Sequence, residues 1–246
     1  MSLPVHLVAT LAGVAAGDVV EISGDEAHHA VAVRRLRVGE QVVLTDGAGT
    51  SARGVVATTG KRVFTVEVAE PRHEERQAPS VTVVQALPKG DRGELAVEVL
   101  TEIGVDVIVP WAASRSVAVW RGDRAAKSHA KWTATAREAA KQSRRAWFPT
   151  VAPLATTEDV AALLGEAEVA VVLHEGATEP LSAISVQGSV TMVVVVGPEG
   201  GISDEELASF EAAGVRPVRL GREVLRTSTA GLAAVAALLA GTDRWS

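Results

Sequence analysis

The chain has 246 residues, 47% of them hydrophobic, which is enough to build one large core or two smaller ones. It contains no cysteine, and this excludes disulfides, thiolate metal ligands and catalysis by a cysteine nucleophile. The formal net charge of -6 argues against a protein that binds nucleic acid over its whole surface. At the N-terminus no basic segment precedes an apolar one, and no apolar run reaches the ~20 residues of a membrane span, so we expect a cytoplasmic protein.

Residues 1–72 carry the pattern of a small β-barrel or curled sheet. Four segments rich in β-branched residues are separated by turn sequences such as DGAG and TTGK. The predicted strands are DVVEIS, EQVVLTD, ARGVVAT and RVFTVEVAE, and a helical segment lies within residues 24–40. Residues 73–80 are polar and include a proline, which is typical of a linker between domains.

Beyond the linker, residues 81–246 alternate between strands and helices. The predicted strands are VTVVQAL, VDVIVP, EVAVVLHE, TMVVVVG and VRPVRL. Helices are expected at 93–104, 124–145, 157–164 and 203–214, and a last alanine-rich helix runs to about residue 240. Continuous apolar strands alternating with helices predict an α/β domain whose mostly parallel sheet is covered on both faces.

Three loops at strand ends are the candidate ligand site, because ligands of open α/β sheets bind beyond the carboxyl ends of the strands. They begin at His174, Gly197 and Gly221. The glycines of GPEGGIS would let the backbone approach a ligand closely, although a tight strand-to-helix turn without a ligand is the alternative. Neither a dinucleotide fingerprint nor a phosphate loop is present. Glu199 and an acidic first helical turn disfavour a pyrophosphate, so a cationic or neutral cofactor such as S-adenosylmethionine fits better.

Positive charge is concentrated between residues 111 and 150, a segment that contains nine basic residues and two acidic ones. This basic island predicts a polyanion bound at one place, and a solvated helix face is the alternative. Trp120, Trp132 and Trp147 lie in it and could stack on bases or fill a core. His28 and His29 do not predict a metal site, because adjacent histidines on a helix point about 100° apart and no third ligand is near.

Several motifs together resemble the RsmE family of 16S ribosomal RNA (uracil-N3) methyltransferases, in the SPOUT superfamily. They are VVGPEGGIS, the LG and LRTSTAG that follow it, and AREAAKQSRR before it. Residues 24–49 are similar to that family's PUA-like RNA-binding barrel. The resemblance implies a PUA-like β-barrel over 1–72 and a SPOUT α/β domain over 81–246 with a C-terminal trefoil knot. It further implies S-adenosylmethionine as cofactor, a homodimer, and methylation of a decoding-centre uridine in the small ribosomal subunit.

The resemblance also suggests which residues form the site. The residues expected to bind the cofactor are Leu173, His174, Glu175, Gly197, Pro198, Glu199, Gly200, Gly201, Leu220, Gly221, Leu225, Arg226, Thr229 and Ala230. Those expected to contact RNA are His29, Arg34, Arg35, Arg37, Arg115, Arg137, Gln142, Ser143 and Arg144.

Arg226 is the expected catalytic residue, with Glu199 or Glu175 as a possible general base, and no metal is expected. Glu223 and Ser228 depart from the family pattern, which has arginine and glutamate there, so side-chain roles at these positions do not carry over. A knotted ribose 2'-O-methyltransferase and a non-catalytic RNA-binding assembly factor remain alternative readings.

Overall fold

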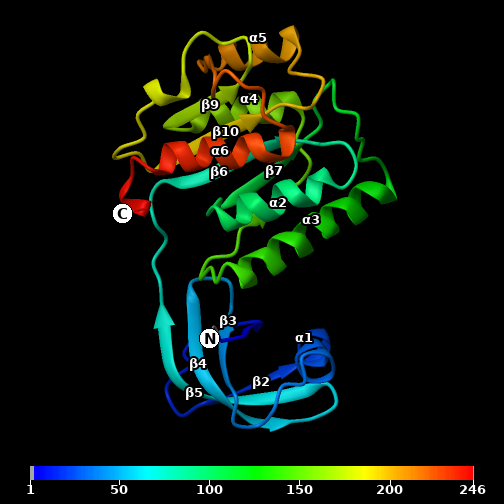
Figure 1. Cartoon of the computed structure of the whole chain (residues 1–246), viewed down its shortest axis with the longest axis vertical. Helices are drawn as coiled ribbons and strands as arrows, with labels where there is room; N and C mark the ends of the chain where they lie inside the picture. Colours follow the sequence, from blue (N-terminus) through cyan, green and yellow to red (C-terminus); the bar gives the residue numbers. More distant parts are fainter. Residues whose placement is uncertain (1–2, 246) are drawn as a thin grey trace. The chain divides into compact units, whose positions relative to one another are not determined.

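The computed structural model describes residues 3–245, which form two compact units (Figure 1). Of the described residues, the first unit comprises 3–76 together with 141–148, and the second comprises 77–140 with 149–245. Residues 141–148 therefore belong with the N-terminal strands, although nothing in the sequence pattern indicated it. Among the described residues no helix is both long and apolar enough to cross a membrane.

The first unit is built on a five-stranded sheet in the order β1-β3-β4-β5-β2. Its strands are β1 (Val5–Leu7), β2 (Val19–Ser23), β3 (Gln41–Thr45), β4 (Thr50–Thr59) and β5 (Val63–His73). Strand β1 pairs parallel to β3, and the other neighbours are antiparallel. The four predicted strands are confirmed. The three-residue β1 was missed, because it is too short to show a period of two.

A short helical segment crosses from β2 to β3 and closes the core of this unit. It consists of α1 (Gly24–His28) and a π-helical turn (His29–Val33). Its buried alanines pack against inward residues of the sheet such as Leu44 and Phe64. The helix ends well before residue 40, because Arg35 has φ 58° and an L-residue in that region cannot continue a right-handed helix.

Residues 146–148 lie against the turn between β3 and β4. The Gly49 amide donates to the Ala146 carbonyl at 3.0 Å, and the Phe148 amide donates to the Gly47 carbonyl at 2.9 Å. The Trp147 indole donates to the main-chain carbonyl of Glu74 at 2.7 Å. A Cβ on Gly49 would lie 2.5 Å from the Trp147 ring. The glycines of the DGAG turn are therefore required by the segment packed on them.

The second unit contains a six-stranded sheet in the order β11-β9-β10-β6-β7-β8, and every neighbouring pair is parallel. Its strands are β6 (Ser80–Ala86), β7 (Val107–Trp111), β8 (Thr150–Val151), β9 (Val169–Leu173), β10 (Thr191–Val196) and β11 (Pro217–Val218). Alternate residues of β6, β7, β9 and β10 face two separate cores, so these strands read as unbroken apolar runs. The predicted parallel sheet is confirmed.

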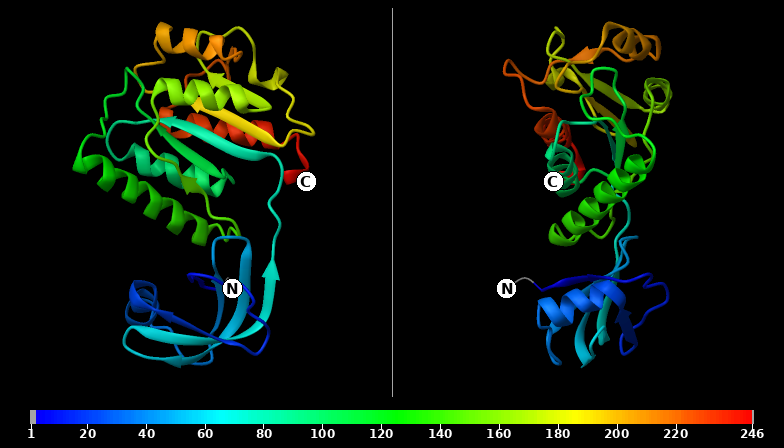
Figure 2. Two further views of the ribbon diagram at one scale, coloured as in Figure 1. Left: turned by 180° about the vertical axis from the view of Figure 1, so that it is seen from behind. Right: turned by 90° about the vertical axis from the view of Figure 1, so that its right-hand side faces the viewer.

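Helices cover both faces of this sheet (Figure 2). One face carries α2 (Arg92–Glu102), α3 (Asp123–Gln142) and α6 (Thr227–Leu239). The other carries α4 (Thr157–Glu166) and α5 (Asp204–Ala212). Short 3-10 turns lie at Leu181–Ala183 and Asp243–Trp245. The trefoil knot implied by the family resemblance stays a prediction.

Candidate functional site

A cavity of about 750 Å³ lies beyond the carboxyl ends of β9, β10 and β11. These strands are parallel neighbours, so the three loops that follow them reach the same edge of the sheet. Thirteen of the fourteen residues expected to bind the cofactor line this cavity: Leu173, His174, Glu175, Gly197, Pro198, Glu199, Gly200, Gly201, Leu220, Gly221, Leu225, Arg226 and Ala230. Thr229 is not among the lining residues, and its hydroxyl instead donates to the Arg226 carbonyl at 3.3 Å.

The glycines of the β10–α5 loop are required by contacts within the protein itself. A Cβ on Gly197 would lie 2.7 Å from Ile202, and one on Gly200 would lie 3.0 Å from the Arg115 carbonyl oxygen. Gly201 has φ 75°, which disfavours any side chain. Gly221 differs, because its nearest contact would be a Glu223 oxygen at 3.9 Å. A Cβ on Gly201 would likewise meet nothing closer than 3.9 Å, so Gly221 is the one of these four glycines that is restricted neither by a close contact nor by a positive φ.

Two carboxylates hold the loops of the cavity in place. Glu199 accepts a hydrogen bond at 3.2 Å from the Lys89 backbone amide, which links the β10–α5 loop to the loop after β6. Glu206 is 4% exposed and accepts from the backbone amides of Ser203 at 2.9 Å and Ser114 at 2.7 Å. Both carboxylates thus bind main-chain donors of the protein.

Basic residues outnumber acidic ones around the cavity. Its lining includes three carboxylates, Glu175, Glu199 and Glu223, and six basic side chains, Lys89, Arg92, Arg115, Arg219, Arg222 and Arg226. Sequence reasoning had placed only Arg226 in the cofactor site and had assigned Arg115 to RNA. It had not included Arg219 and Arg222, which lie in the segment after β11, or Lys89 and Arg92, which follow β6 and lie outside the three candidate loops. Their excess positive charge would attract an anionic substrate to the mouth of the cavity.

Arg226 occupies the N-cap position of α6, and its carbonyl accepts from the Thr229 and Ala230 amides at 2.9 Å each. Within residues 3–245 its exposed guanidinium has no hydrogen-bond or ion-pair partner, so it does not bridge loop carbonyls. Ser228 follows in the first turn of α6, is 2% exposed, and has a hydroxyl without a hydrogen-bond partner among the described residues.

The residues expected to contact RNA fall into three places. Arg115 lies on the cavity wall, and Arg137 lies on α3, where it pairs with Glu138 at 3.2 Å. The others belong to the first unit and are exposed: His29, Arg34, Arg35, Arg37, Gln142, Ser143 and Arg144. No group of three metal-ligating side chains occurs in the part of the chain that the structure describes.

Comparisons with known proteins agree with this architecture. A model of the RNA methyltransferase domain matches residues 74–239, and a model of the RNA methyltransferase PUA domain matches residues 22–69. The ribosomal RNA small subunit methyltransferase E of Mycobacterium bovis is 45% identical over 93% of this chain and 89% of its own length. The chain belongs to this methyltransferase E family. The Bacillus subtilis member is 31% identical over 90% of each chain.

Two solved methyltransferase structures share the whole fold. The Neisseria gonorrhoeae enzyme, bound to S-adenosylmethionine, superposes with a TM-score of 0.87 and is 27% identical over 97% of this chain and 98% of its own. A Legionella pneumophila protein in complex with the same cofactor gives a TM-score of 0.90 at 25% identity, over 98% of this chain and 99% of its own. Both units of the present protein are therefore those of the family.

Proposed function

We propose that this protein methylates N3 of one uridine of 16S ribosomal RNA, using S-adenosylmethionine, and that the uridine lies in the decoding centre of the small subunit. The cavity formed by the three strand-end loops is the observation that carries the proposal. It combines a cofactor-sized space with an excess of basic side chains, and family membership supplies the reaction class. We place the reaction in the cytoplasm, with the ribosomal subunit as substrate.

The residues around the cavity suit S-adenosylmethionine. A volume of about 750 Å³ lies within the range of roughly 300–1,000 Å³ that is usual for small-molecule sites. Leu173, Leu220 and Ala230 offer apolar contact for an adenine ring, and Gly221 leaves its side-chain space open. When bound, the cofactor supplies an electrophilic methyl group on a sulfonium. The protein must then orient uracil N3 and manage its proton.

Arg226 is the residue that we assign to the reacting base. Loss of the N3 proton spreads negative charge over O2 and O4 of uracil, and a planar guanidinium can donate to such an oxygen. Arg226 is available for this, because it is exposed on the cavity wall and engages no other side chain in the described part of the chain. Positive charge beside N3 also lowers the pKa of the imide and eases proton loss. Glu175 is the better placed of the two possible bases, since Glu199 already accepts from the Lys89 amide.

The central experiment is methyl transfer to 16S ribosomal RNA or small subunits, followed by digestion to nucleosides. Methylation found on the free base supports the proposal, and methylation found on the ribose would indicate a 2'-O-methyltransferase. Failure to bind S-adenosylmethionine in calorimetry would favour a non-catalytic assembly factor. Replacing Arg226 by lysine should lower the single-turnover rate by roughly 10²–10³. Cofactor and RNA affinities should stay near wild type, as they should in Arg216→Lys, an exposed arginine outside the cavity.

A glycine substitution tests the cofactor site separately. Gly221→Val should abolish S-adenosylmethionine binding without disturbing the fold, because its Cβ meets nothing closer than 3.9 Å in the protein. Gly200→Val tests the cofactor site less specifically, because a Cβ at residue 200 would also lie 3.0 Å from Arg115. Gly165→Val on α4 is the matched control, because a Cβ there meets nothing within 4 Å and the residue is not part of the cavity lining. Undiminished affinity in Gly221→Val would remove the third loop from the site.

We also propose that the protein is a homodimer. Helix α6 packs one face on β6, β10 and α2. Its other face carries apolar residues that are part-exposed, Leu232, Ala233 and Ala236, or exposed, Ala237. A second copy is the partner that the family resemblance implies for this face. Sedimentation should give a dimer at micromolar concentration, and a monomer there would contradict the proposal.

A further inference from the structure

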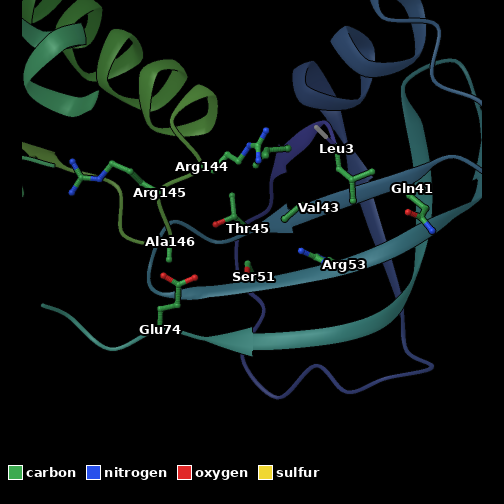
Figure 3. Close-up of a pocket in the computed structure, with 11 residues that line it drawn as sticks. Leu3, Gln41, Val43, Thr45, Ser51, Arg53, Glu74, Arg144, Arg145 and Ala146 are labelled. Carbon is green, nitrogen blue, oxygen red and sulfur yellow. The ribbon is translucent and has the colours of Figure 1, made fainter. Parts of the chain in front are cut away.

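The first unit contains a second cavity, a cleft of about 380 Å³ on the outer face of its sheet. Val5, Val43 and Arg53 are cross-strand neighbours on β1, β3 and β4, so their side chains share this face. Leu44 and Ala52, which alternate with them, point into the core. Figure 3 shows Val43 and Thr45 along the floor, with Gln41 toward one end and Glu74 toward the other.

One wall of the cleft comes from Arg144, Arg145 and Ala146, far away in the sequence. Backbone hydrogen bonds to the DGAG turn hold this segment on the sheet. The Lys141 ammonium adds two bonds of 3.0 Å to the Glu26 carboxylate. Arg144 has φ 57°, a costly conformation for a residue with a side chain. The fold thus fixes Arg144 at the cleft, and Figure 3 shows its guanidinium over the Thr45 side of the floor.

The chemistry of the cleft combines positive charge with an apolar surface. Arg53, Arg144 and Arg145 line it, and Glu74 is the one carboxylate among its lining residues. Glu70, which lies opposite Arg53 across the strands, is already bound to Arg72 at 2.6 Å. Arginines suit phosphates, and a floor of valines suits the face of a nucleobase. A space of this size can take one or two nucleotides of a single strand but not a duplex.

We propose that this cleft binds a single-stranded segment of the substrate RNA, with Arg53 and Arg144 contacting phosphates and a base lying on Val5 and Val43. The proposal rests on the proposed function for the nature of the polyanion. Glu74 repels phosphate from its end of the cleft and accepts a hydrogen bond from a ribose hydroxyl or a base N–H. The cleft therefore selects an unpaired strand.

The test is binding of a labelled single-stranded RNA by the full-length protein at several salt concentrations. Arg53→Ala should weaken binding about tenfold at low salt, the effect of losing one charged contact. It should also reduce the slope of log affinity against log salt by about 0.7. Gln41→Glu, which adds a carboxylate at nearly constant shape, should weaken binding similarly. Arg62→Ala is the matched control, because it removes an exposed arginine of the same unit that pairs with Asp25 outside the cleft.

The outcomes separate this proposal from the proposed function. If both cleft variants bind RNA with wild-type affinity and slope, or if duplex RNA binds equally well, the cleft proposal is overturned. If the cleft variants raise the KM for RNA and leave kcat and S-adenosylmethionine affinity unchanged, it is supported. If the wild type binds RNA in an Arg53-dependent manner but transfers no methyl group, the cleft stands and the proposed function fails. Unfolding midpoints equal to wild type show that neither cleft variant acts through stability.

Discussion

Glu26 should make the stability of the first unit depend on pH. Burial raises the pKa of its carboxyl, but hydrogen bonds and charge from His6 and Lys141 outweigh burial and lower it from 4.5 to about 2. The Glu26 and Lys141 side chains are only 20% and 10% exposed, so solvent screens the pair weakly. A difference of about 2.5 pKa units corresponds to about 3 kcal/mol of folding free energy. Because the folded pKa is the lower one, this stabilisation is present above pH ~4.5 and is lost as the pH falls toward 2.

Replacing Glu26 by glutamine isolates this contribution from the other carboxylates. Urea unfolding should show the variant less stable than wild type by about 3 kcal/mol at pH 7, with the difference shrinking as the pH falls from about 4.5 to 2. Hydrogen exchange at pH 7 should locate the loss in residues 3–76 and 141–148, which form one unit. A difference that stays constant between pH 7 and pH 2 would refute the electrostatic origin. Unchanged exchange in 141–148 would show that the Glu26–Lys141 pair does not hold this segment.

Two further substitutions test the packing on which the two sites depend. Gly49→Ala should destabilise the first unit by about 3 kcal/mol in urea unfolding, because it combines positive φ with contact to Trp147. Gly13 also has positive φ, but a Cβ there would meet nothing within 4 Å, so Gly13→Ala should lower the unfolding free energy by about 1–2 kcal/mol. Equal losses in the two variants would show that the contact with Trp147 does not contribute. Glu206→Gln leaves one amide, that of Ser114 or of Ser203, facing a side-chain NH₂. It should lower stability by about 1.5–3 kcal/mol and weaken S-adenosylmethionine binding, and an unchanged melting temperature would count against the anchoring role.

The sequence predicted those helices and strands in which the periodicity of apolar residues continues over enough positions to be recognised. The apolar strands of the second unit and the helix expected at 203–214 both have strong local patterns, and the structure confirms both. The three-residue β1 and the place of residues 141–148 have no such pattern. That segment joins the first unit through Trp147, Phe148 and main-chain bonds to a turn almost 100 residues earlier. Contacts between residues so far apart in the sequence produce no local hydrophobic periodicity, so the sequence pattern does not predict them.

The candidate site was predicted where loops follow parallel strands, because topology brings these loops together. Its charge was not predicted. Local reading of GPEGGIS gave weight to Glu199, whose carboxylate in fact accepts a main-chain hydrogen bond. The basic residues that dominate the lining come from the segments that follow β6, β7 and β11, and the glycine-rich GPEGGIS loop contributes none. A net charge set by several separate loops can be counted only once the fold is known.

The departures from the family pattern at Glu223 and Ser228 bear on how the third loop keeps its shape. Main-chain hydrogen bonds fix both of its ends: the Arg219 amide donates to the Glu179 carbonyl at 2.8 Å, and the Arg226 carbonyl accepts from two amides of α6. The Gln85 side-chain amide also donates a hydrogen bond of 3.3 Å to the Thr227 carbonyl. None of these contacts uses the side chain at 223 or 228. The loop can therefore present Gly221 and Arg226 to the cavity with other side chains at those two positions, since its geometry is carried by the backbone.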